Sequence, residues 1–240
     1  MNLVIDIGNT QTKVGWFNGP ELHRTEVFSS FTPEGLEQLL TGKTVTASII
    51  SSTGVDSTPF ATILEQHGRC INFTHQTPVP VNNNYLTPET LGLDRLAAVV
   101  GAHFLYPKKP VLVIDTGTAI TYDLIEADGT YPGGVISPGL QMRFKAMHHF
   151  TKRLPLLQPN AETPVTGDST ESCMQSGGLN GAIFEVEGFI SWYRAKYQGL
   201  ITVVTGGDAT IFEKHLKSKI FAVPELVLRG LNEILHYNVS

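Results

Sequence analysis

The sequence predicts an α/β fold made of two halves of similar construction. Short apolar runs rich in β-branched residues alternate with segments whose apolar residues recur at helical spacing. One strand-and-turn unit is repeated: Leu-Val-Ile-Asp at residues 3–6 returns at residues 112–115, and glycine follows two positions after each aspartate. The chain has 240 residues, of which 41% are hydrophobic, so it can bury a core in one large domain or two smaller ones.

The predicted strands are the segments in which β-branched residues dominate between turn residues. In chain order they cover residues 3–6, 12–17, 44–50, 111–115, 119–125 and 201–207. The predicted helices lie between them, and Pro33 and Gly68 are typical of a helix start and a helix stop. These helices cover residues 33–40, 57–68, 90–104, 143–153, 178–197, 208–217 and 224–237. Strands that alternate with helices in this way are typical of α/β proteins.

The segment Tyr-Pro-Lys-Lys-Pro at residues 106–110 is the best candidate for a boundary between the halves. It predicts an N-terminal domain over residues 1–106 and a C-terminal domain over residues 107–240. The repeat supports this division, because its second copy begins directly after the boundary. In both copies a second strand follows the glycine turn, which predicts a β-hairpin rather than a strand-to-helix junction.

Charge and cysteine content exclude several classes of protein. The formal net charge of −5 provides no basic excess for holding DNA or RNA. Cys70 and Cys173 are far apart and form no Cys-x-x-Cys pattern, so neither a disulfide framework nor a thiolate zinc site is indicated. No run of about 18 uncharged apolar residues is present, so we expect no membrane span and a cytoplasmic protein.

The two Asp–Gly turns carry the chemistry that is best suited to a nucleotide. Backbone amides in a glycine turn can converge on phosphate, and Thr10, Thr118 and Lys13 could add donors. The carboxylates of Asp6 and Asp115 would repel bare phosphate, so they indicate a cation or a positioned water at each turn. The plain alternative is a hairpin whose aspartate bonds to its own turn. The presence of two copies favours the metal–nucleotide interpretation, and no P-loop or dinucleotide-binding motif competes with it.

A third glycine turn follows the strand at residues 201–207. Gly206 and Gly207 precede a predicted helix that starts near Asp208. The turn could be an ordinary strand-to-helix connection in which Asp208 favours the helix N-terminus. It could instead present its backbone to the adenosine of a bound nucleotide.

Taken together, these motifs resemble the acetate/sugar kinase, Hsp70 and actin superfamily. The matching segments are Asp-Ile-Gly-Asn-Thr at residues 6–10, Asp-Thr-Gly-Thr-Ala-Ile-Thr at 115–121 and Thr-Gly-Gly-Asp at 205–208. Within that superfamily, Leu-Gly-Leu-Asp-Arg at residues 91–95 and Gly-Gly-Val-Ile-Ser-Pro-Gly at 133–139 are similar to type III pantothenate kinase. The resemblance extends over essentially the whole chain.

The resemblance implies two ribonuclease-H-like domains with a duplicated core, the actin-like ATPase fold. It also implies a homodimer that phosphorylates pantothenate with ATP, together with Mg²⁺ and a monovalent cation (K⁺ or NH₄⁺), in the first step of coenzyme A biosynthesis. Asp94 would be the catalytic base, and Thr170 would approach pantothenate across the dimer interface. The implied pantothenate-binding residues are Tyr85, Gly92, Leu93, Asp94, Arg95 and Thr170. The implied ATP-binding residues are Asp6, Ile7, Gly8, Asn9, Thr10, Gln11, Thr12, Lys13, Thr118, Gly206 and Gly207. The implied metal-binding residues are Asp115 and Asp6.

Each of these roles has a plainer alternative. Asp94 could stabilise only the start of its helix, and Arg95 could be a solvated helix residue. Tyr85 could cap a turn, and Thr170 could be a helix N-cap, for which Ser169 competes. For the protein as a whole, the alternatives are another small-molecule kinase of the same fold and a regulatory relative without turnover.

Overall fold

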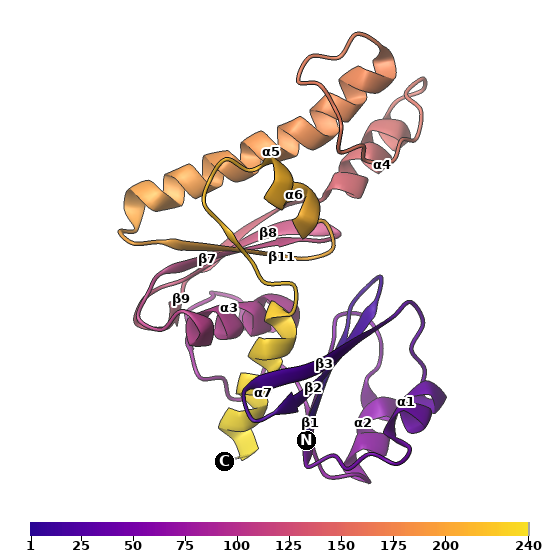
Figure 1. Ribbon diagram of the computed structural model, residues 1–240, viewed down its shortest axis with the longest axis vertical. Helices are drawn as coiled ribbons and strands as arrows, with labels where there is room; N and C mark the ends of the chain where they lie inside the picture. The colour runs from indigo at the N-terminus through magenta and orange to yellow at the C-terminus, as the bar shows by residue number, and fades with distance from the viewer. Residues whose placement is uncertain (240) are drawn as a thin grey trace. The chain divides into compact units, whose positions relative to one another are not determined.

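The computed structural model describes residues 1–239, and the chain folds into two compact units (Figure 1). The first unit comprises residues 1–108, residues 127–132 and the chain from residue 225 onward, and the second comprises residues 109–126 and 133–224. The domain limits predicted from sequence, 1–106 and 107–240, divide the chain at a single point, whereas the observed units exchange the chain more than once. Residues 127–132 and the C-terminal segment instead return to the first unit.

The first unit contains a five-stranded sheet in the order β3-β2-β1-β4-β5. β1 pairs antiparallel with β2 and parallel with β4. β2 pairs antiparallel with β3, and β4 pairs parallel with β5. The strands are β1 (Asn2–Ile7), β2 (Thr12–Asn18), β3 (Glu21–Phe28), β4 (Ala47–Ser52) and β5 (Arg69–Asn72).

The helices of the first unit connect its parallel strands or pack on its sheet. α1 (Pro33–Leu40) leads into β4, and α2 (Thr58–Glu65) leads from β4 to β5. α3 (Leu93–Leu105) lies beside α7 (Leu226–Val239), as Figure 1 also shows. A 3₁₀ turn covers Pro88–Thr90, and two short strands, β6 (Asn82–Asn83) and β9 (Thr130–Tyr131), pair with each other.

The second unit repeats this arrangement with the strand order β10-β8-β7-β11-β12. β8 pairs antiparallel with β7 and β10, whereas β7, β11 and β12 run parallel. The strands are β7 (Val111–Thr116), β8 (Ala119–Ile125), β10 (Gly133–Pro138), β11 (Ile201–Thr205) and β12 (Phe221–Ala222), and the helices are α4 (Leu140–Phe150), α5 (Thr170–Lys196) and α6 (Ala209–His215). Because both sheets place their strands in the order third, second, first, fourth, fifth, the predicted duplicated ribonuclease-H-like fold is confirmed.

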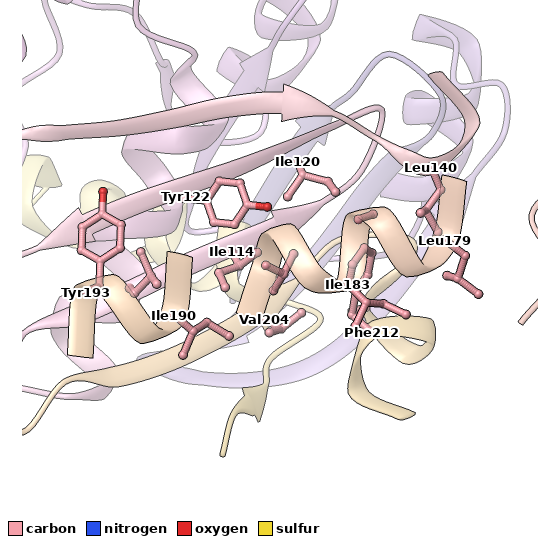
Figure 2. Close-up of a cluster of buried hydrophobic side chains, with 14 of the residues drawn as sticks. Ile114, Ile120, Tyr122, Leu140, Leu179, Ile183, Ile190, Tyr193, Val204 and Phe212 are labelled. Atoms are coloured by element: carbon pink, nitrogen blue, oxygen red, sulfur yellow. The ribbon is translucent and has the colours of Figure 1, made fainter. Parts of the chain in front are cut away.

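The core of the second unit lies between its sheet and α5. Ile183, Val186 and Ile190 recur at helical spacing along α5 and are buried against strand residues that include Ile114 and Tyr122. Figure 2 shows Ile183 and Ile190 of α5 in one cluster with Ile114 and Tyr122 of the sheet. Each fully buried side chain of this size contributes about 1.5–3 kcal/mol relative to exposure. The apolar face of α5 therefore fixes the strands that carry the second Asp–Gly turn.

Several elements differ from the sequence prediction. α5 begins at Thr170, eight residues before the predicted start at Gly178, because Ser169 and Ser172 form a capping box around its first turn. The strands β3, β5, β10 and β12 were not predicted, because they lack a continuous β-branched run. Among residues 1–239, no helix combines the length and the apolar character that crossing a membrane requires.

Candidate active site

The first Asp–Gly turn is a hairpin between β1 and β2, as predicted. Residues 8–11 form the loop, and the Gly8 amide donates to the Gln11 carbonyl oxygen at 3.1 Å. The Ile7 carbonyl oxygen accepts from the Thr53 amide at 3.1 Å, which ties the loop to the chain after β4. Ile7 and Thr12 are buried, whereas Asn9, Thr10 and Gln11 are exposed. The exposed tip is therefore the part of this turn that can meet a ligand.

The second Asp–Gly turn is one residue shorter than the first. Thr116 pairs with Ile120, so residues 117–119 form the loop, and the Gly117 amide donates to the Ala119 carbonyl oxygen at 3.0 Å. The register places Thr121 opposite Asp115. In the first hairpin Lys13 occupies the place opposite Asp6. The repeat seen in sequence is thus a structural repeat with different cross-strand neighbours for its two carboxylates.

The third glycine turn packs directly on the second Asp–Gly turn. Thr205 is the register partner of Asp115, and the Asp208 amide donates to the Thr116 carbonyl oxygen at 2.9 Å. Gly206 has a φ of 98°, and a Cβ added there would clash with Asp115 Oδ1. Asp208 is the N-cap residue of α6, but its side chain makes no capping hydrogen bond. Burial raises the pKa of this carboxyl. The fold therefore brings Asp115 and Gly206 together.

The Gly-Leu-Asp-Arg segment forms the start of α3. Gly92 is the N-cap residue, Leu93 is the first helical residue, and Asp94 Oδ1 accepts from the Arg95 amide at 2.9 Å. The carboxylate thus stabilises the helix start, as the plainer alternative anticipated. A carboxylate that accepts one backbone hydrogen bond at a helix start can still accept a proton from a substrate.

Arg95 and Tyr85 lie together in the first unit. The Arg95 side chain is only 8% exposed, and its guanidinium carbon lies 5.7 Å from the centre of the Tyr85 ring. Tyr85 stacks in turn on Tyr131, with ring centres 6.2 Å apart. Stacking of this kind fixes a guanidinium in one orientation. Arg95 is therefore buried and packs against the Tyr85 ring, so it is not a solvated helix residue.

Thr170 lies in the second unit as the first residue of α5, with Ser169 as the N-cap. The Ser169 hydroxyl accepts from the Ser172 amide at 3.2 Å. Thr170 is exposed and lines an open groove of about 740 Å³, together with Met147, Leu154, Gly167, Asp168, Ser169, Cys173 and Met174. The cap role thus belongs to Ser169, and the Thr170 side chain can meet a ligand.

The residues suited to a cation are carboxylates at strand ends. Asp6 and Asp115 each lie one residue before the end of the central strand of a sheet, and both are half-buried. Carboxylate and carbonyl oxygens are the donors that Mg²⁺ and monovalent cations prefer, so the chemistry of both turns fits the implied ions. Within residues 1–239, no group of three or more His, Cys, Asp or Glu side chains forms a metal cluster.

Sequence reasoning assigned no role to Gly139, which the structure places against the second turn. The Gly139 amide donates to the Thr118 carbonyl oxygen at 3.2 Å. A Cβ at Gly139 would clash with the carbonyl oxygens of Gly117 and Thr118. Gly139 is the last residue of the Gly-Gly-Val-Ile-Ser-Pro-Gly motif, so the sequence could have pointed to it, but only the fold shows what this glycine contacts.

The sequence matches one protein family over most of its length. The family model described as type III pantothenate kinase matches residues 2–192. A type III pantothenate kinase from Phocaeicola vulgatus is 47% identical over 241 residues, which is 99% of each chain. A type III pantothenate kinase from Cytophaga hutchinsonii is 43% identical over 240 residues and covers 100% of both chains.

Solved structures with low sequence identity share the fold. A Campylobacter jejuni protein, whose description proposes a Baf family transcriptional activator, matches with a TM-score of 0.66 and 19% identity over 98% of each chain. Component A of the (R)-2-hydroxyglutaryl-CoA dehydratase from Acidaminococcus fermentans matches with a TM-score of 0.52 and 14% identity, over 98% of this chain and 96% of that one. At these identities the likeness shows the architecture alone.

Proposed function

The chain belongs to the type III pantothenate kinase family, whose reaction is the ATP-dependent phosphorylation of pantothenate, and we propose that Asp94 is its catalytic base. The observation that carries this assignment is the start of α3, where Asp94 directly precedes the buried, Tyr85-stacked Arg95. One short segment thus combines a proton acceptor with a cation suited to the pantothenate carboxylate.

Phosphoryl transfer requires positioning and an acceptor for one proton. In the proposed step, the primary hydroxyl oxygen of pantothenate bonds to the γ-phosphorus of ATP, and its proton passes to the Asp94 carboxylate. The bond between the γ-phosphorus and the β,γ-bridging oxygen breaks, and ADP leaves. Arg95 holds the pantothenate carboxylate. The Tyr85 ring packs against the guanidinium and holds its orientation, and Gly92 and Leu93 line the same pocket.

The two hairpin turns are proposed to bind the phosphates of ATP. Asn9, Thr10 and Gln11 present backbone amides and polar side chains at the exposed tip of the first turn, and Gly8 lets a phosphate approach the backbone closely. Ile7 and Thr12 are buried, so their contribution is limited to backbone groups. Thr118 is exposed at the second turn, and Gly206 and Gly207 present backbone beside Asp115. Mg²⁺, held with the help of Asp6, would neutralise phosphate oxygens, and Asp115 would help to hold K⁺ or NH₄⁺.

We further propose a homodimer formed through one face of α5. Phe184 and Trp192 are 60% and 57% exposed on this helix. Gly177, Gly181 and Gly188 recur at compatible helical spacing, and a Cβ added at any of them would meet open space. Aromatic side chains exposed beside glycines form a surface on which a second copy of the helix can pack closely. Thr170, at the start of the same helix, would then lie near the partner's substrate.

A coupled assay tests the proposed function. It contains ATP and pantothenate and compares potassium or ammonium with sodium alone; we expect turnover that depends on pantothenate and rises with K⁺ or NH₄⁺. A panel of sugars and acetate tests for another kinase of this fold, which would phosphorylate one of them in preference to pantothenate. If no acceptor is phosphorylated and the nucleotide-free protein binds DNA, the protein is a regulatory relative. We place the reaction in the cytoplasm, where both free cysteines, Cys70 and Cys173, would stay reduced.

A further inference from the structure

A half-buried polar cluster lies beside the second Asp–Gly turn, and no residue of it belongs to the proposed catalytic set. It consists of Tyr122 on β8, Ser137 on β10, Arg143 on α4 and Glu185 on α5. The Arg143 and Glu185 side chains are 18% and 27% exposed, and their Nη2 and Oε2 atoms lie 2.7 Å apart. The Tyr122 hydroxyl donates to Glu185 Oε1 at 2.9 Å.

Arg143 holds the end of β10 by several hydrogen bonds at once. Its Nε donates to the Pro138 carbonyl oxygen at 2.9 Å, and its Nη2 donates to Ser137 Oγ at 3.0 Å. Its backbone amide also donates to the Gly139 carbonyl oxygen at 3.0 Å. A planar guanidinium can donate to these acceptors at once because its N–H groups point in fixed directions. A lysine ammonium lacks this planar arrangement of donors.

Glu185 keeps Arg143 in this position. It accepts from Arg143 and Tyr122, and a hydrogen bond from Ser137 also reaches it. Residues of β8 and α5 thereby help to hold the guanidinium in place. Several hydrogen-bond partners at once restrict the orientations that a half-buried guanidinium can adopt.

Residues 137–139, which Arg143 holds, contact the 117–118 turn directly. Gly139 follows Pro138, and its amide donates to the Thr118 carbonyl oxygen at 3.2 Å. The close fit of Gly139 against the carbonyl groups of Gly117 and Thr118 leaves no room for a side chain. A shift of residues 137–139 would therefore move the turn that carries Thr118.

We propose that Arg143 and Glu185 are positioning residues that set the orientation of the 117–118 turn for ATP, by clamping residues 137–139. The inference rests on the proposed function, since it takes the turn to be a phosphate-binding element. It adds residues that lie outside the turn and whose effect on the reaction would pass through residues 137–139 and their pairing with β8.

The test combines nucleotide binding with steady-state kinetics on Arg143→Gln, Arg143→Lys and Glu185→Gln. We expect Arg143→Gln to weaken binding of a non-hydrolysable ATP analogue, and to raise KM for ATP, by about tenfold to a hundredfold. KM for pantothenate should change by less than about twofold, and Arg143→Lys should recover only part of the loss. The control is Arg24→Gln, which removes the ion pair of Arg24 with Glu26 on β3 and should leave nucleotide binding unchanged.

Two outcomes overturn the proposal. One is unchanged analogue binding in a folded Arg143→Gln variant; the other is an equal rise of KM for both substrates. If Arg143→Gln does not fold, Glu185→Gln carries the test, because it weakens the hold on the Arg143 guanidinium and should weaken analogue binding in the same direction. Analogue binding needs no pantothenate, so a wild type that binds the analogue without phosphorylating pantothenate refutes the proposed function and leaves this inference testable.

Discussion

Asp6 lies directly opposite Lys13 across the β1–β2 hairpin. Because the second loop is one residue shorter, the equivalent carboxylate, Asp115, lies opposite the neutral side chain of Thr121. Register partners in an antiparallel pair project from the same face of the sheet. The face that carries Asp6 therefore also carries the positive charge of Lys13, whereas the face that carries Asp115 has the neutral Thr121 at that position. This difference fits the proposal that the two carboxylates hold different cations.

Replacement of Asp94 by Asn should remove the proton acceptor and keep the helix start. The Asn side-chain oxygen can still accept from the Arg95 amide, so the thermal midpoint should stay close to that of the wild type. We expect kcat to fall by about a hundredfold to ten-thousandfold with a small change in either KM. Steady-state kinetics measure this effect. A variant that keeps wild-type kcat would show that Asp94 only stabilises α3.

Replacement of Arg95 by Gln should weaken binding of pantothenate through the loss of one charge-assisted contact. We expect KM for pantothenate to rise by about tenfold to a hundredfold, while KM for ATP changes little. The decisive comparison uses the pantothenate analogue in which a hydroxymethyl group replaces the carboxylate. Wild type should use this analogue poorly, and Arg95→Gln should use both acceptors about equally. Equal discrimination by the two proteins would contradict carboxylate recognition by Arg95.

Replacement of Gly206 by Ala should disturb the cation site at Asp115 and the backbone of Thr116 beside it. The φ of 98° is unfavourable for alanine by about 1–3 kcal/mol, and the new methyl group would press on Asp115 Oδ1. We expect a higher potassium concentration for half-maximal activation. Gly207→Ala is the matched stability control, because a Cβ at that position meets open space. Potassium titrations that coincide for wild type and Gly206→Ala would place the cation elsewhere.

The stability of the second unit should fall in acid through Glu185. Burial alone would raise the pKa of Glu185, but hydrogen bonds from Ser137, Arg143 and Tyr122 outweigh it, and the pKa lies below its ordinary value. A carboxyl whose folded pKa is lowered stabilises the fold above its unfolded pKa, about 4.3, and this stabilisation disappears as pH falls through the folded value. The difference in unfolding free energy between wild type and Glu185→Gln should therefore shrink between pH 7 and pH 3. Urea denaturation measures it, and a difference independent of pH would rule out this linkage.

A charge on the exposed face of α5 should separate the proposed dimer. Phe184→Asp places a carboxylate where two copies of the helix would pack, and an unpaired buried charge is strongly unfavourable. We expect sedimentation equilibrium to report a dimer for the wild type and a monomer for this variant. The control is Tyr237→Asp on α7, since Tyr237 is as exposed as Trp192, at 57%. A Phe184→Asp variant with wild-type mass would exclude this face as the interface.

Much of the fold could be predicted because its local patterns are strong. The strands β1 and β7 are apolar runs that end in Asp and are buried on both faces, and the hairpins that follow them have the expected turn residues. The edge strands could not be predicted, since a strand such as β12 is exposed and is held by pairing rather than by its own composition. The first turn of α5 contains small polar residues, so its helical state depends on the capping box.

The sequence by itself determined the duplicated Asp–Gly hairpins, the α/β class and the segment that carries Asp94 and Arg95, because each depends on residues that are close together in the chain. Only the tertiary structure decided which residues face one another. The register sets Lys13 against Asp6 and Thr121 against Asp115, and parallel pairing brings Gly206 to Asp115. The contact of Arg143 with Glu185 joins α4 to α5 across 42 positions of the chain. Such pairings depend on loop length and on how helices pack on a sheet, and hydrophobic periodicity along a single sequence contains no information about either.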